Sequence, residues 1–195
     1  MKYAPLLLIS ALLGCSTAPT VKSWLDPVSS ATITAQSVPL ILARDEPARL
    51  SDAREFAQLA AIEVNRMGER RLYLVAIPWT SRRRIRTELE HVEDAFERIQ
   101  LRMGDRSIVL DRHRGEVAEL GMGESPLPLP IPGTRQFFFP IGRADLHALA
   151  SSDRVQLTTQ GTSPAPMHYD EWQDGRRSLG DFLARLPAEP VAVQP

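Results

Sequence analysis

Two runs of alternating apolar and polar residues, separated by three residues, constrain the fold more than any other feature. The runs cover Leu59–Arg66 and Arg70–Trp79, and Met67, Gly68 and Glu69 lie between them. Apolar residues at every second position place one face of a β-strand against a core. A glycine between two such runs supplies the positive φ that a tight turn needs. The segment 56–79 therefore predicts a long β-hairpin.

The alternation within this hairpin indicates which side chains enter the core. Ile62 and Val64 alternate in the first run, and Leu72, Leu74 and Ala76 alternate in the second. Each strand then has one candidate core face.

Further strands follow from similar runs. The segment 31–42 predicts a strand that lies at an edge or bends, because Pro39 interrupts it. A second hairpin is expected over 97–112 with its turn at Gly104 and Asp105, and buried strands over 137–141 and 155–159. Pro126, Pro128, Pro130 and Pro132 cannot pair as a central strand, so they run over the surface or along an edge.

Helical spacing of apolar residues occurs near the end of the chain. We expect short helices over 144–150 and 178–186, and either a helix or a solvated linker over 82–94. The sum is a mainly β chain, either a β-sandwich or a curved antiparallel sheet of hairpins, with two short helices near the C-terminus. We expect one globular domain over 31–187 and a disordered tail over 188–195.

The first fifteen residues resemble the export signal of a bacterial lipoprotein. Lys2 precedes an uncharged stretch that is too short to span a bilayer. The tetrad Leu12, Leu13, Gly14 and Cys15 is similar to the lipobox, which implies removal of residues 1–14 and lipidation of Cys15. A diacylglyceryl group on the thiol and an acyl chain such as palmitate on the amine would anchor the chain stably.

The residue after the lipobox cysteine bears on localisation. Ser16 stands where an aspartate would retain an enterobacterial lipoprotein in the inner membrane, so the resemblance implies the inner leaflet of the outer membrane, facing the periplasm. Residues 15–30 are small, polar and interrupted by Pro19 and Pro27, which predicts a flexible tether. The segments 44–47 and 62–68 and the strand ending at Trp79 resemble uncharacterised proteobacterial lipoproteins, a group with no activity to transfer.

Charge and cysteine content exclude several function classes. Loss of Lys2 with the signal leaves 22 of the 23 basic side chains against 24 acidic ones, so no global field attracts nucleic acid. Cys15 is the only cysteine, which leaves no thiol for a disulfide, a metal cluster or a nucleophile. Nearly all the basic residues are arginines, and Arg82, Arg83, Arg84 and Arg86 form a run that either meets lipid headgroups or pairs with the acidic residues after it.

Catalytic and metal-binding patterns are absent from the sequence. His91, His113, His147 and His168 never recur at the spacing of three or four that helical zinc sites use. The sequence also lacks a nucleophile elbow, a phosphate-binding glycine loop and a dinucleotide fingerprint. We therefore predict no metal and no cofactor, and we assign no catalytic residue.

One polar cluster is the candidate binding region. His168, Tyr169, Asp170, Glu171 and Trp172 gather an imidazole, two carboxylates and two aromatic rings. An exposed loop is the simpler interpretation, and a groove that binds or hydrolyses a glycan is the alternative. The leading hypothesis is a non-enzymatic, lipid-tethered envelope accessory that binds another protein or the cell wall. The alternative is a periplasmic enzyme or small-ligand binder that uses these five residues.

Overall fold

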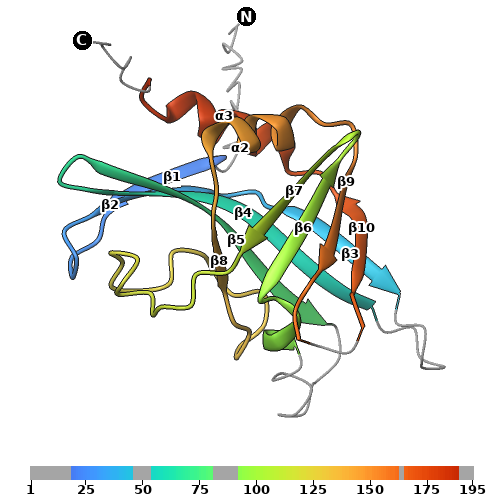
Figure 1. Ribbon diagram of the computed structural model, residues 1–195. Coiled ribbons are helices and arrows are strands. Elements are labelled where there is room, and N and C mark those ends of the chain that lie inside the picture. Colours follow the sequence, from blue (N-terminus) through green and yellow to red (C-terminus); the bar gives the residue numbers. More distant parts are fainter. Residues whose placement is uncertain (1–18, 46–53, 81–91, 163–164, 189–195) are drawn as a thin grey trace, which may run out of the picture.

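The computed structural model describes residues 19–45, 54–80, 92–162 and 165–188. These residues form a single antiparallel sheet of ten strands that curls into a half-barrel, with two helices across one end (Figure 1). The mainly β prediction is confirmed in its curved-sheet form, and the two helices near the C-terminus are present.

The strands include every predicted one and two that the sequence did not indicate, β1 and β10. They are β1 (Val21–Leu25), β2 (Thr32–Gln36), β3 (Leu40–Asp45), β4 (Arg54–Arg66), β5 (Glu69–Thr80), β6 (Arg98–Met103), β7 (Arg106–Asp111), β8 (Phe137–Pro140), β9 (Val155–Thr159) and β10 (His168–Gln173). The helices are α2 (Arg143–Ser151) and α3 (Arg176–Arg185), and residues 92–95 form a single helical turn.

The long hairpin is confirmed. β4 and β5 pair continuously from Glu55 opposite Thr80 to Arg66 opposite Glu69. Met67 and Gly68 form the turn with φ of 52° and 90°, and the Gly68 amide donates to Oδ1 of Asn65 at 3.1 Å. Two consecutive positive φ values match the right-handed twist of a hairpin, which explains the glycine.

The prediction of one core face for each hairpin strand is wrong, because both faces of β4 and β5 are buried. Leu74 and Ala76 pack in the main cluster, which fills the inside of the curl and which we call the inner face. Ile62 and Val64 point to the opposite, outer face and pack in a second cluster. Apolar residues at consecutive positions serve two cores here, as in sheets that are covered on both sides.

The long segment between β7 and β8 covers the outer face of this hairpin. Leu120, Met122 and Leu127 from this segment are buried in the second cluster, and Leu127 belongs to the proline stretch. Asp26, in the turn after β1, accepts a hydrogen bond from the Gly123 amide at 2.6 Å. The proline stretch forms no strand, as expected, and it runs over the sheet surface (Figure 1).

β4 pairs with two different strands along its second edge. Its C-terminal half pairs with β2 and its N-terminal half with β3. The chain bends at Pro39 between β2 and β3, which agrees with the predicted interruption of the strand at this residue. β2 also pairs with β1, so residues 21–30, which we assigned to the tether, belong to the folded domain. The polar composition of residues 21–30 did not indicate a strand, because β1 forms through backbone hydrogen bonds to β2.

The rest of the sheet continues from β3 through β10, β9 and β6 to β7. The hairpin of β6 and β7 confirms the prediction for 97–112. Just after β7, the His113 amide donates to the Phe138 carbonyl of β8 at 2.8 Å, which brings the two ends of the curl together. The main core inside contains large, fully buried rings, including Phe96, Phe139 and Phe182.

Both C-terminal helices pack across one end of the curl. Leu146 and Leu149 of α2 and Leu179, Phe182 and Leu183 of α3 enter the main cluster, so the apolar side predicted for the helix over 178–186 is confirmed. The start of the described chain and the end of α3 lie at this same end (Figure 1).

Candidate functional site

The five residues from His168 to Trp172 form most of strand β10, which lies between β9 and β3. The interpretation as an exposed loop is therefore wrong. The strand pairs on both edges, and such pairing depends on residues far away in the sequence. Because successive side chains of a strand alternate, β10 divides the cluster between the two faces of the sheet.

Tyr169 and Glu171 are structural residues of the inner side. The Tyr169 side chain is fully buried, its ring centroid lies 6.2 Å from that of Phe96, and the Arg44 guanidinium lies over it. Glu171 accepts hydrogen bonds from the Val155 amide at 3.3 Å and from Arg176 at 2.6 Å, which ties β10 to the first turn of α3. These contacts hold the fold and leave little of either side chain for a ligand.

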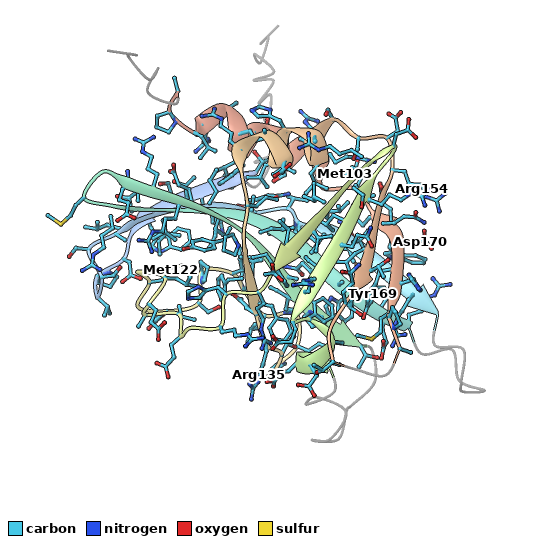
Figure 2. The ribbon with its side chains drawn as sticks, viewed as in Figure 1. Met103, Met122, Arg135, Arg154, Tyr169 and Asp170 are labelled. Carbon is cyan, nitrogen blue, oxygen red and sulfur yellow. The ribbon has the colours of Figure 1, made fainter. Side chains whose placement is uncertain are left out.

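Asp170 and His168 belong to the outer face. Asp170 accepts from Nε2 of Gln156 at 2.7 Å and from Arg154 at 2.9 Å, and Figure 2 shows Arg154 and Asp170 side by side. The Gln156 hydrogen bond, followed by that of Arg154, lowers the pKa of Asp170 below its ordinary value. His168 Nδ1 lies 3.0 Å from the Thr158 hydroxyl. This carboxylate therefore stays ionised and is unsuited to act as a general acid.

The outer face of the neighbouring strands continues the same polar chemistry. Its side chains pair across the strands as Gln160 with Gln100, Gln100 with Ser107, and Arg98 with Asp111. Arg98 and Arg154 are each matched by a carboxylate, Asp111 and Asp170, and exposed Arg102, which lies opposite Ser107 and Gln156 in the strand register, adds one positive charge. The surface is therefore rich in hydrogen-bonding groups and carries a small positive excess. We call the outer-face residues His168, Asp170, Gln156, Thr158, Gln100, Gln160 and Ser107 the polar face.

An aromatic row borders the polar face. Trp172 is 57% exposed, and the Arg54 guanidinium lies over its ring at 4.4 Å. Its ring meets Phe56 edge-on at a centroid distance of 6.3 Å, and Phe56 stacks on Trp79 at 4.2 Å. Nε1 of Trp79 is buried and has no hydrogen-bond partner among the described residues.

Phe56 and Trp79 were missed as candidate residues by the sequence analysis. They lie on different strands at the open end of the hairpin, and they face one another because Phe56 pairs with Trp79 in the register of β4 and β5. That register could have been read from the two-residue turn, since Phe56 precedes Met67 by as many residues as Trp79 follows Gly68. Their meeting with Trp172 could not, because it depends on the pairing of β10 with β3.

Two surface hollows lie elsewhere. One, of about 640 Å³, is lined by the residues after β7 and before β8, among them Arg112, Arg114 and Arg135. Each of these guanidinium groups is paired with Glu93 or Glu97. The hollow is consequently close to neutral, and its arginines brace the junction of β7 and β8.

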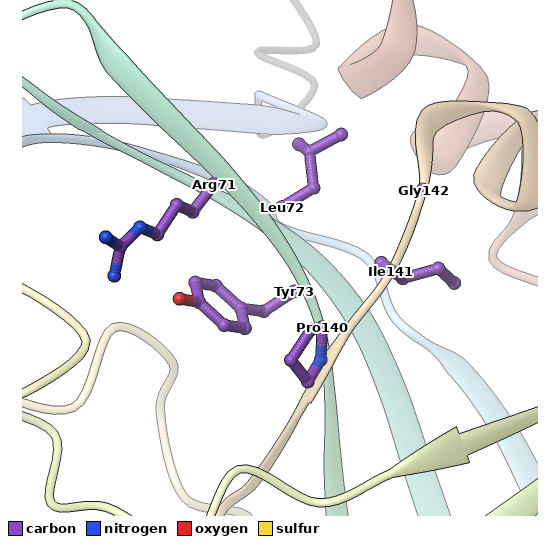
Figure 3. A pocket seen from close by; sticks show the side chains of 6 residues that line it. All are labelled: Arg71, Leu72, Tyr73, Pro140, Ile141 and Gly142. Carbon is purple, nitrogen blue, oxygen red and sulfur yellow. The ribbon is translucent and has the colours of Figure 1, made fainter.

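The second hollow, of about 410 Å³, lies at the free edge of β5 beyond the end of β8. Figure 3 shows Arg71 and Tyr73 on one side of the strand and Leu72 and Ile141 on the other. Few polar groups converge on it, so it is a weaker candidate than the β10 face.

The described residues hold no cluster of three or more metal-ligating side chains. Asp170 and Glu171 point to opposite faces, and Glu171 is held by Arg176, so they do not form a catalytic pair. No described helix is long and apolar enough to cross a membrane. Cys15 and the run Arg82–Arg86 lie outside the described residues.

No protein family model, no curated protein and no solved structure matches this chain. The candidate site therefore stands on its own geometry.

Proposed function

We propose that this protein is a lipid-anchored, non-enzymatic binding module of the cell envelope, and that the polar face with Trp172 binds the glycan of the cell wall. The lipid on Cys15 is the anchor that the lipobox implies, and Ser16 favours the outer membrane with the domain in the periplasm. Under this proposal the anchor fixes the domain in one compartment, and the outer face supplies the specificity.

The observation that carries the proposal is the half-exposed Trp172 beside a surface rich in hydrogen-bonding groups. Tryptophan presents a flat apolar ring at low conformational cost, which suits stacking against the flat face of a sugar ring. Amide, hydroxyl and carboxylate groups both accept and donate, as sugar hydroxyls require. A nucleic acid or an anionic lipid would be held mainly by positive charge, and the arginines Arg98, Arg102 and Arg154 of this face exceed its carboxylates, Asp111 and Asp170, by only one.

The arrangement does not favour the alternative of an enzyme. A glycosidase needs two carboxyl groups on either side of one bond, and the two carboxylates of β10 lie on opposite sides of the sheet. Asp170 is held by Arg154 and Gln156, so we expect these side chains to bind sugar hydroxyl groups by hydrogen bonds and not to transfer a proton.

Cosedimentation with purified peptidoglycan tests the glycan. Trp172→Ala should weaken binding about tenfold, which corresponds to about 1.4 kcal/mol. Met67→Ala is the matched control, because Met67 is fully exposed in the hairpin turn on no part of the polar face. His168→Ala should also weaken binding, whereas His147→Ala on helix α2 should not. Unchanged binding by Trp172→Ala and His168→Ala would refute the glycan assignment.

The anchor is tested separately. The protein from cells grown with labelled palmitate should carry the label, and Cys15→Ala should abolish it and release the protein from the membrane fraction. Density fractionation should place the lipidated protein with the outer membrane. Recovery of the lipidated protein in the inner-membrane fraction would contradict the proposed localisation, but it would not bear on the proposed glycan-binding site.

A further inference from the structure

The folded domain begins against helix α3. The Thr20 carbonyl accepts a hydrogen bond from the Ser178 hydroxyl of α3 at 2.7 Å and from the Ser37 amide at 2.8 Å. The next residue, Val21, is 2% exposed and packs in the main cluster. The point at which the chain enters the domain is therefore fixed beside the helical end of the curled sheet.

Very little chain separates this point from the lipid-bearing cysteine. Cys15 and Thr20 are five residues apart, and a fully extended chain of that length spans at most about 17 Å. A compact domain of about 170 residues has a radius of gyration of about 15 Å and hence a diameter of about 40 Å. A tether this short cannot reach around the domain, whose half-circumference is roughly 60 Å.

The surface around the entry point suits lipid headgroups. The exposed side of α3 carries Arg177, Ala184 and Arg185 with a single carboxylate, Asp181. On α2 the exposed residues include His147, and the one carboxylate, Asp145, is paired with Arg106. Guanidinium groups bind phosphate well, and α3 carries two exposed arginines, Arg177 and Arg185, against the one exposed carboxylate of Asp181. Asp174, just before α3, is paired with Arg176.

From the tether length and this surface, we propose that the layer formed by α2 and α3 faces the lipid bilayer and contacts its headgroups. The inference rests on the Cys15 anchor of the proposed function. It places the opposite end of the sheet, where Arg135 lies in Figure 2, away from the membrane. The orientation is thus set by the chain between Cys15 and Thr20 together with the charge of α3.

Position-specific quenching tests this orientation in the intact lipidated protein. The thiol of Cys15 is blocked by lipid and the chain has no other cysteine, so one introduced cysteine is labelled uniquely. Ala184→Cys reports on α3 and Arg135→Cys on the far end, and each carries an environment-sensitive dye. The two proteins are reconstituted in vesicles of phosphatidylethanolamine and phosphatidylglycerol, with and without a spin-labelled headgroup.

We expect severalfold stronger quenching at position 184 than at position 135. Inserting about twenty glycine and serine residues after Ser16, with a mean span of about 25 Å, should reduce this difference because the domain can then rotate. Equal quenching at the two positions in the natural-length protein, or stronger quenching at position 135, overturns the inference.

The failure of this inference and of the proposed function are distinguishable. If the intact mass shows no lipid on Cys15, the anchor and the orientation are both wrong. If the lipid is present but quenching is equal, only the orientation is wrong. Neither result changes peptidoglycan binding by the polar face, which is measured without vesicles.

Discussion

Replacing Gln36 by leucine tests how the sheet passes from one pair of strands to the next. Gln36 is 3% exposed and lies at the end of β2, where β4 changes its partner from β2 to β3. Its Oε1 accepts from the Ala61 amide at 3.0 Å, and its Nε2 donates to the carbonyls of Val38 at 2.7 Å and Gly175 at 3.0 Å. One side chain thus replaces the backbone pairing that the bend removes and also fixes the residue before α3.

The expected cost follows from these three groups. The Ala61 amide is fully buried and would lose its partner, at about 1–3 kcal/mol. The Gly175 carbonyl keeps a second hydrogen bond from the Leu179 amide, so its loss and that of Val38 are smaller, at about 1 kcal/mol each. The free energy of unfolding should fall by about 3–5 kcal/mol, which lowers Tm by roughly 6–20 °C in a domain of this size.

Urea unfolding followed by circular dichroism measures this change. Gln173→Leu is the matched control, since Gln173 is exposed near the end of β10, and it should change stability by less than about 0.5 kcal/mol. Gln36→Glu should also destabilise the protein, because a carboxylate cannot donate to the two carbonyls. If Gln36→Leu behaves like Gln173→Leu, the reasoning about the strand junction is refuted.

Three further perturbations have a defined sign. The hydrogen bond from the Gly123 amide is the main cause that lowers the pKa of Asp26. The ionised carboxylate therefore stabilises the fold above about pH 4, and this stability is lost as the pH falls further. Asp26→Asn should make the free energy of unfolding depend less on pH in that acidic range, as measured by acid unfolding. Burial raises the pKa of Glu63, so its ionised form lowers the stability of the fold at neutral pH. Glu63→Gln should raise Tm at pH 7, and this gain should disappear below about pH 4. A gain in Tm that is the same at low pH would contradict this reasoning. A Cβ on Gly161 would lie 1.6 Å from the Asp94 carbonyl oxygen. Gly161→Ala should therefore lower the free energy of unfolding by about 1–3 kcal/mol, as measured by thermal unfolding. An unchanged stability would mean that the helical turn over 92–95 can move to make room for the methyl group.

Local patterns in the sequence determined the elements whose information lies within a few neighbouring residues. The hairpin turn at Gly68 requires positive φ, and the spacing of Leu179, Phe182 and Leu183 places them on one side of a helix. The same reasoning located the second hairpin and the strands before and after α2. None of these elements needs a distant partner to be recognised.

The candidate site needed more than local pattern. Trp172 was found in a cluster of polar and aromatic residues, but its neighbours Phe56 and Trp79 come from strands more than ninety residues earlier. The polar face likewise joins β10 to β9 and β6 through side-chain hydrogen bonds that the sequence does not contain. Residue types predicted the chemistry, and strand pairing decided which of them share a face.

Composition and periodicity by themselves determined that the chain is mainly β, that its longest hairpin turns at Gly68, and that two short helices lie near the C-terminus. Only the tertiary structure decided that β4 and β5 are buried on both faces, that β1 belongs to the domain, and that β10 is a central strand. The physical reason is that alternation fixes which residues share a face, while the burial of that face depends on which distant segment packs against it.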